Sequence, residues 1–130
     1  MKKKILIVED NSDLLKVLQM LLQGGYETVG AMKGEQAVEI AVAERPDLIL
    51  LDIILPDMNG LETARLVRQH PEIRATPILA MTASVSRIDE DDCILSGCDD
   101  YIPKPFTYEQ LLPRIQKLLE HNGTRKPSSS

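Results

Sequence analysis

The chain has 130 residues, of which 43% are hydrophobic and 27% are charged, and its formal net charge is −5. This length supports one domain with a single core. The acidic balance argues against affinity for nucleic acid or an anionic membrane, because both need clustered basic side chains. The basic run at residues 2–4 precedes too few apolar residues for a signal peptide, and no apolar run is long enough to span a membrane. We therefore expect a cytoplasmic protein.

The first half of the chain alternates short apolar runs with segments of helical periodicity. The first run ends in an acidic pair, Glu9 and Asp10, and is followed by leucines at helical spacing. Strand, acid and then helix is the beginning of a β-α unit. The expected elements are, in order, a strand at 5–8, a helix capped by Asn11 or Ser12 and ended by Gly24 and Gly25, a strand at 26–30 and a helix at 34–44.

The most apolar stretch of the chain covers residues 48–55 and is interrupted only by Asp52. An aliphatic run bounded by Pro46 and Pro56 fits a strand that is covered on both faces, as in a parallel sheet. Ligands of such sheets gather beyond the carboxyl ends of the strands, which is where Asp52 falls. By itself, Asp52 also fits a simple turn cap, so its role depends on which residues meet it.

The second half of the chain continues the alternation. The expected elements are a helix from 61 to about 70, a strand at 77–81 followed by Thr82, Ala83 and Ser84, a polar helix between 84 and 97, a strand at 99–102 and a last helix opened by a capping box of Thr107 and Gln110. Pro113 conflicts with that helix, so we expect either a bend or a later helix start. The acidic cluster at 89–92 indicates a solvated face. Residues 122–130 are expected to form a flexible tail after a domain at residues 1–121.

Five short strands alternating with five helices predict a doubly wound α/β fold of the flavodoxin-like class, with helices on both faces of a parallel sheet. The natural strand order is 2-1-3-4-5, which places the carboxyl ends of the first and third strands side by side. Glu9, Asp10 and Asp52 then meet at one edge of the sheet. Cys93 and Cys98 match no zinc or redox spacing and are expected to be ordinary buried or surface thiols.

Carboxylates that converge in this way repel one another, and a hard divalent cation relieves the repulsion. Mg²⁺ is satisfied by one or two carboxylates, a backbone carbonyl and water. Lys104, after the fifth strand, adds a cation to the same edge, and Thr82 adds a hydroxyl. Together these groups are suited to receive a phosphoryl group on Asp52.

In this order, the residues resemble the receiver domain of two-component response regulators over about residues 3–120. The matching positions are Glu9 and Asp10, Asp52, Thr82 and Ala83, Lys104 and Pro105, and Tyr101 as the switch aromatic. The resemblance implies the same strand order. It also implies that the chain is not a turnover enzyme, and that Asp52 accepts a phosphoryl group from a histidine kinase or a histidine phosphotransfer protein.

The resemblance further implies roles for the other residues of the site. Asp10, Asp52 and the carbonyl of Ile54 would bind Mg²⁺ directly, with Glu9 acting mainly through water. Lys104, Thr82 and Ala83 would contact the phosphoryl oxygens, and Thr82 and Tyr101 would form the switch. The signal would leave through the surface of the fourth helix, fifth strand and fifth helix to a target protein, with no nucleic acid or membrane partner.

Two positions depart from the family pattern. Glu9 stands where many members have aspartate, which lengthens the reach to the metal but keeps the charge. Ile54, two residues past the acceptor, is apolar, so we expect slow self-dephosphorylation.

Rival interpretations fit less well. A haloacid dehalogenase phosphatase would need a second aspartate at position 54, and a nucleotide-binding domain would need a glycine-rich phosphate loop. A pseudo-receiver that only binds partners is disfavoured by the intact acidic site. No DNA-binding helix pair follows, so we expect a stand-alone receiver, favoured by Met1 and the expected tail, or a piece of a larger regulator or hybrid kinase.

Overall fold

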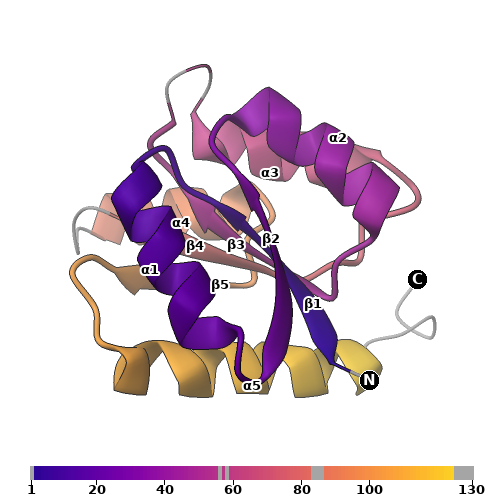
Figure 1. Ribbon diagram of the computed structural model, residues 1–130. Coiled ribbons are helices and arrows are strands. Elements are labelled where there is room, and N and C mark those ends of the chain that lie inside the picture. Colours follow the sequence, from indigo (N-terminus) through magenta and orange to yellow (C-terminus); the bar gives the residue numbers. More distant parts are fainter. Residues whose placement is uncertain (1, 56, 58, 83–86, 125–130) are drawn as a thin grey trace.

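The computed structural model describes residues 2–55, 57, 59–82 and 87–124. These residues form a five-stranded parallel sheet with the order β2-β1-β3-β4-β5, as Figure 1 shows, which confirms the predicted fold. The strands are β1 (Lys3–Val8), β2 (Tyr26–Ala31), β3 (Leu48–Asp52), β4 (Ile78–Thr82) and β5 (Asp100–Pro103). The order reverses between β1 and β3, and their carboxyl ends are therefore neighbours.

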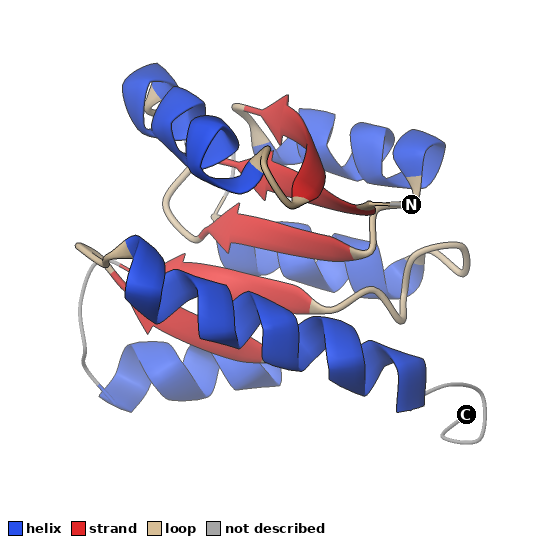
Figure 2. Ribbon diagram, turned by 60° about the horizontal axis from the view of Figure 1, so that its bottom comes forward, coloured by secondary structure: helices blue, strands red, loops and turns tan. Residues whose placement is uncertain are grey.

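Helices cover both faces of the sheet (Figure 2). They are α1 (Ser12–Leu22), α2 (Gly34–Glu44), α3 (Gly60–Gln69), α4 (Arg87–Leu95) and α5 (Tyr108–Thr124). Side chains of α1 and α5 share one buried cluster with the sheet, and side chains of α2, α3 and α4 share the other. Right-handed crossovers between parallel strands account for this division. No helix in the described part of the chain is long and apolar enough to cross a membrane.

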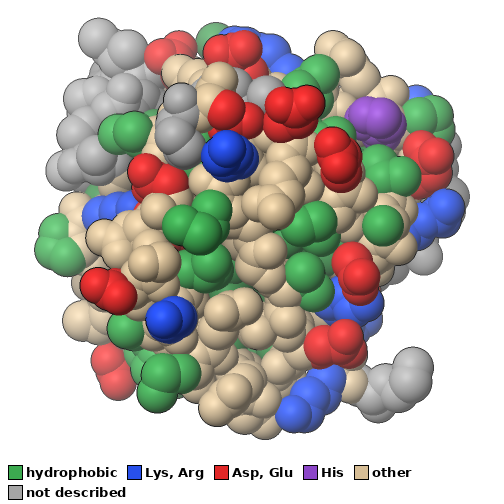
Figure 3. All heavy atoms as spheres, turned by 45° about the horizontal axis from the view of Figure 1, so that its top comes forward, with side chains coloured by type: hydrophobic (Ala, Val, Ile, Leu, Met, Phe, Trp, Pro, Cys, Tyr) green, Lys and Arg blue, Asp and Glu red, His purple; other side chains and the backbone are tan. Residues whose placement is uncertain are grey.

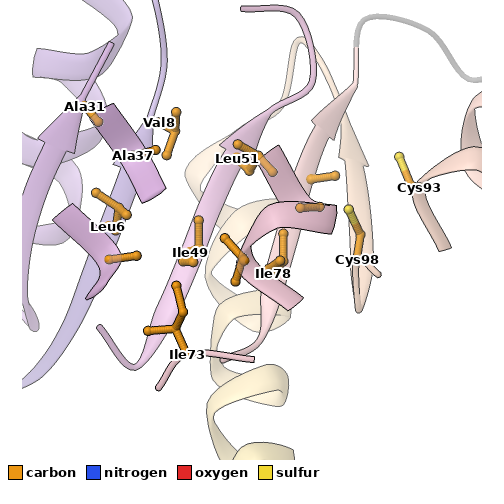
Figure 4. Close-up of a cluster of buried hydrophobic side chains, with 14 residues drawn as sticks. Leu6, Val8, Ala31, Ala37, Ile49, Leu51, Ile73, Ile78, Cys93 and Cys98 are labelled. Carbon is orange, nitrogen blue, oxygen red and sulfur yellow. The ribbon is translucent and has the colours of Figure 1, made fainter. Parts of the chain in front are cut away.

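The central strand β3 is buried along its whole length because both of its faces are covered. Ile49 and Leu51 pack into the cluster under α2 and α3, which Figure 4 shows, and Leu48 and Leu50 pack under α1 and α5. Alternate side chains of a strand point to opposite faces, so a strand between two helical layers needs apolar residues at every position. This explains the uninterrupted aliphatic run that ends at Asp52.

Two helix starts follow the predicted capping chemistry. The Asn11 side chain accepts hydrogen bonds from the amides of the first turn of α1, so Asn11 rather than Ser12 is the cap. The Thr107 amide donates to Gln110 Oε1 at 2.9 Å, and the Gln110 amide donates to Thr107 Oγ1 at 3.2 Å, which confirms the capping box. Pro113 lies inside α5, so the alternative of a later helix start is wrong.

Element boundaries differ from the predictions by a few residues. The fourth strand begins at Ile78 and includes Thr82, and α4 begins at Arg87. The last helix runs to Thr124, beyond the expected end of the domain at residue 121, while residues 125–130 of the expected tail and residues 84–86 lie outside the described part. Both cysteines are buried, and a hydrogen bond with Cys93 together with burial raises the pKa of the Cys98 thiol.

Candidate functional site

Three carboxylates meet at the carboxyl ends of β1 and β3. Glu9 and Asp10 directly follow β1, Asp52 ends β3, and carboxylate oxygens from all three lie within 4.8 Å of one another. Glu9 and Asp52 are 1% and 4% exposed, whereas Asp10 is exposed to solvent. The pairing of β1 with β3 therefore gathers these residues from positions more than forty residues apart in the sequence.

The Asp52 carboxylate is held by two hydrogen bonds, one to each oxygen. The amide of Ile54 donates to Oδ1 at 3.0 Å, and the ammonium of Lys104 donates to Oδ2 at 3.1 Å. The carboxylate is consequently fixed in orientation at the surface edge of a buried strand.

Lys104 links the two buried carboxylates. Its backbone amide donates to the carbonyl of Thr82 at 2.7 Å, and its Nζ donates to Glu9 Oε1 at 2.8 Å as well as to Asp52. Burial by itself would lower the pKa of Lys104, but the hydrogen bond to Glu9 and the charge of Asp52 outweigh it, so the pKa is raised. Lys104 thus keeps its charge between the two acids.

Glu9 uses both carboxylate oxygens within the protein. Oε1 accepts from Lys104, and Oε2 accepts from the amide of Asn11 at 3.1 Å. Burial raises the pKa of Glu9, and these two hydrogen bonds oppose that rise. Both Glu9 oxygens are therefore already engaged by donors of the protein, and the expectation that Glu9 acts through water stays a prediction.

The site carries more negative than positive charge. Three carboxylates face one lysine. Figure 3 shows acidic and basic side chains interspersed over one face of the molecule. The donors are all oxygens, and Asp10 presents its carboxylate to solvent, where a hydrated ion can approach. This donor set suits Mg²⁺, which prefers oxygen ligands and keeps several waters.

The remaining predicted residues lie on the neighbouring strands. Thr82 ends β4, is 1% exposed, and its Oγ1 has no hydrogen-bond partner among the described residues. Tyr101 in β5 is half-buried against the cluster of α2, α3 and α4. Its carbonyl accepts a hydrogen bond from Arg114 at 2.7 Å. Ala83 lies outside the described residues.

The loop between β3 and α3 contains two residues whose roles the sequence analysis missed. Asn59 caps α3 by accepting from the amide of Leu61 at 2.8 Å, and it forms an antiparallel bridge with Ile54. Gly60 donates its amide to the carbonyl of Ile53 at 2.8 Å. An asparagine and a glycine ahead of a helical pattern are a start signal, so this cap was readable from the sequence.

We predict that Asp10→Asn stabilises the chain in the absence of divalent cations. Removing one charge relieves repulsion among the three carboxylates and should raise the melting temperature by about 3 °C. Thermal unfolding with a chelator present measures the effect, and Glu39→Gln on the exposed face of α2 is the control. With excess Mg²⁺ the variant should instead have the lower melting temperature, because the native site then gains binding free energy. A variant less stable than the native chain under both conditions would contradict the prediction.

Comparison with known proteins identifies the family. The family model of the response regulator receiver domain matches residues 5–116. The chain belongs to this family. A relative, the polar-differentiation response regulator DivK of Brucella anthropi, is 38% identical over 120 residues, which cover 92% of this chain and 98% of DivK. The alkaline phosphatase synthesis transcriptional regulatory protein PhoP of Bacillus subtilis is 37% identical over 130 residues, which cover 99% of this chain but 53% of PhoP.

Solved structures of receiver domains have the same fold. A response regulator from Chloroflexus aurantiacus superimposes with a TM-score of 0.88 at 32% identity, covering 92% of this chain and 99% of that one. The receiver domain of sensor histidine kinase PA1611 from Pseudomonas aeruginosa gives a TM-score of 0.85 at 34% identity with the same coverage. In that structure a magnesium ion is coordinated in the active site cleft.

Membership defines the general activity of this chain. Receiver domains belong to two-component systems, where they are signalling modules rather than turnover enzymes, and they interact with histidine kinases and downstream targets. Receiver domains bind Mg²⁺ in an acidic site, and the acidic cluster of this receiver supplies a suitable donor set.

Proposed function

We propose that this receiver switches by phosphorylation of Asp52, with the phosphoryl group coming from the phosphohistidine of a kinase or phosphotransfer protein. The observation that carries the proposal is the buried Asp52 carboxylate, held by Lys104 beside the exposed Asp10. A carboxylate that is held in one orientation at the end of a strand, beside groups that can bind a cation, is a suitable nucleophile.

In the proposed reaction, a carboxylate oxygen of Asp52 forms a bond to phosphorus as the bond from phosphorus to the histidine nitrogen breaks. Asp10, Asp52 and the carbonyl of Ile54 would hold Mg²⁺, with Glu9 contributing through water, and the bound ion supplies positive charge to the phosphoryl oxygens. Lys104 would move its ammonium from Asp52 to one of these oxygens. The acyl phosphate is the signalling state.

Thr82 and Tyr101 are proposed to convert this charge into a change of surface. The Thr82 hydroxyl is buried without a partner in the described part of the chain, and a buried hydroxyl gains from a new acceptor. It would donate to a phosphoryl oxygen, together with the amide of Ala83, and Tyr101 would turn inward. The altered face of α4, β5 and α5 would then bind a downstream target protein.

Intact mass measurement after incubation with a small-molecule phosphodonor tests the proposal. We expect one added phosphoryl group with Mg²⁺, none with a chelator, and none for Asp52→Asn under either condition. Phosphorylation that persists in Asp52→Asn would move the acceptor elsewhere. A native chain that neither gains mass nor binds Mg²⁺ would instead indicate a pseudo-receiver.

We predict that Ile54→Asn shortens the lifetime of the phosphorylated form by roughly three- to tenfold. Ile54 is 59% exposed and lies two residues past the acceptor, where its apolar side chain would keep water from the phosphoryl group. Asparagine would admit and orient water. Loss of the added mass with time measures the lifetime, and Val17→Asn on α1, which replaces a side chain that is 48% exposed, is the control. Equal lifetimes for the native chain, Ile54→Asn and Val17→Asn would contradict the shielding role of Ile54.

A further inference from the structure

The loop that follows the phosphoacceptor strand is tied to the start of α2. Asp57 Oδ1 accepts a hydrogen bond from the amide of Gly34 at 2.8 Å, and its Oδ2 accepts one from the amide of Glu35 at 3.0 Å. Amides in the first turn of a helix have no partner within that helix. One carboxylate from a different loop therefore satisfies two of the free donors of α2.

The first turn of α2 lacks a cap of its own. The side chain of Lys33, at the cap position, makes no capping hydrogen bond, and the Gln36 side chain accepts from the amide of Met32 at 3.1 Å. A negative charge at a helix N-terminus also interacts favourably with the helix dipole. Asp57 thus does for α2 what Asn11 does for α1, but from 22 to 23 residues away.

The base of the same loop is fixed separately. Ile54 pairs with Asn59 in an antiparallel bridge, and its amide donates to Asp52. The amide of Gly60 donates to the carbonyl of Ile53 at 2.8 Å. Ile54 is therefore part of the base of the loop, and Asp57 ties the same loop to α2.

We infer that Asp57 is a positioning residue for the cation site: its bonds to α2 hold the loop so that the Ile54 carbonyl is in place before Mg²⁺ arrives. Ordering a loop on binding costs conformational entropy, and a loop that is ordered beforehand avoids this cost. The inference rests on the proposed function, in which the Ile54 carbonyl is a ligand. Asp57 itself is not one of the three carboxylates of the site, and the resemblance to receiver domains assigns it no role.

Two measurements on Asp57→Ala test the inference, one of them without metal. By hydrogen exchange of the metal-free chain, the amides of Gly34, Glu35 and Ile54 should exchange faster than in the native chain. By titration with Mg²⁺ alone, the Kd should rise about fivefold. Asp57→Asn keeps one acceptor oxygen, so its exchange rates and its Kd for Mg²⁺ should lie between those of the native chain and those of Asp57→Ala. Glu62→Ala removes an exposed carboxylate on α3 and should match the native chain.

A double variant separates positioning from simple helix capping. Lys33 has extended backbone angles that a serine cap also adopts, so Asp57→Ala with Lys33→Ser should restore the cap of α2 without restoring the tie. We expect this chain to recover the native melting temperature while its Mg²⁺ affinity stays weak and its Ile54 amide stays exposed to exchange. Recovery of affinity together with the melting temperature would overturn the inference.

The two hypotheses fail in different ways. If the native chain binds Mg²⁺ and Asp57→Ala binds it equally well, the positioning role of Asp57 is wrong and the proposed function stands. If the native chain binds no Mg²⁺, the proposed metal site is wrong and the role of Asp57 falls with it.

Discussion

Replacement of Gly60 by alanine is expected to lower the free energy of unfolding by about 3 kcal/mol and to reduce phosphorylation of Asp52 severely. A Cβ atom at this position would overlap the carbonyl oxygen of Asp52 and the Cα atom of Ile53. Both are backbone atoms, so no side-chain rotation removes the overlap. The loop or the end of β3 must shift, and either movement displaces the carboxylate that Lys104 and Ile54 now orient.

Gly24→Ala provides the matched control for this prediction. A Cβ atom at Gly24 meets nothing within 4 Å, so the substitution should change stability by less than about 0.5 kcal/mol and leave phosphorylation intact. Denaturant unfolding and intact mass after phosphodonor treatment measure the two effects. If Gly60→Ala were as stable and as readily phosphorylated as Gly24→Ala, the prediction that the close backbone contact at Gly60 positions Asp52 would be wrong.

The fold was predictable because its main signal is local. A strand with both faces buried must be apolar at every position, and the run at residues 48–51 meets that condition. Helical spacing and caps marked the elements between strands. Parallel pairing then requires the polar residues at the strand ends to meet at one edge, which is why Glu9, Asp10 and Asp52 could be grouped without coordinates.

The contacts that hold the loops were not predictable in the same way. Asp57 bonds to amides 22 to 23 residues earlier, and no spacing marks an aspartate as the cap of a distant helix. The one indirect signal is that a lysine, which is a poor cap, stands at the cap position before α2. The roles of Thr82 and Tyr101 in switching, and of Lys104 in binding the phosphoryl group, stay predictions, because they concern the phosphorylated state.

Arg68 is the second residue whose importance depends on distant contacts. From α3 its guanidinium donates to the carbonyls of Gly97 at 2.7 and 3.0 Å, Arg74 at 2.8 Å and Thr76 at 2.6 Å, and to the Asp99 carboxylate at 2.8 Å. The same Asp99 oxygen accepts from the amide of Ile78. The side chain therefore joins α3, the approach to β4 and the approach to β5, a geometry that suits the fork of arginine donors.

Arg68→Met should therefore lower the free energy of unfolding by about 2 to 4 kcal/mol, because it removes the guanidinium that donates to three backbone carbonyls and to the partly buried Asp99 carboxylate. Arg68→Lys should not rescue most of this loss, since one ammonium cannot reproduce the fork. Arg65→Met, at an exposed position of the same helix, should be close to neutral. Denaturant unfolding measures all three.

Phosphorylation of Asp52 distinguishes the loss of stability in Arg68→Met from damage to the carboxylate site. Ile78 begins β4 and Asp99 precedes β5, so the Arg68 contacts lie at the amino ends of the strands, opposite the edge that carries Asp52. At a temperature where Arg68→Met remains folded, its phosphorylation should match that of the native chain. If Arg68→Met were as stable as Arg65→Met, the stabilising role of the Arg68 contacts would be wrong. If Arg68→Met were folded but not phosphorylated on Asp52, the two ends of the sheet would be coupled.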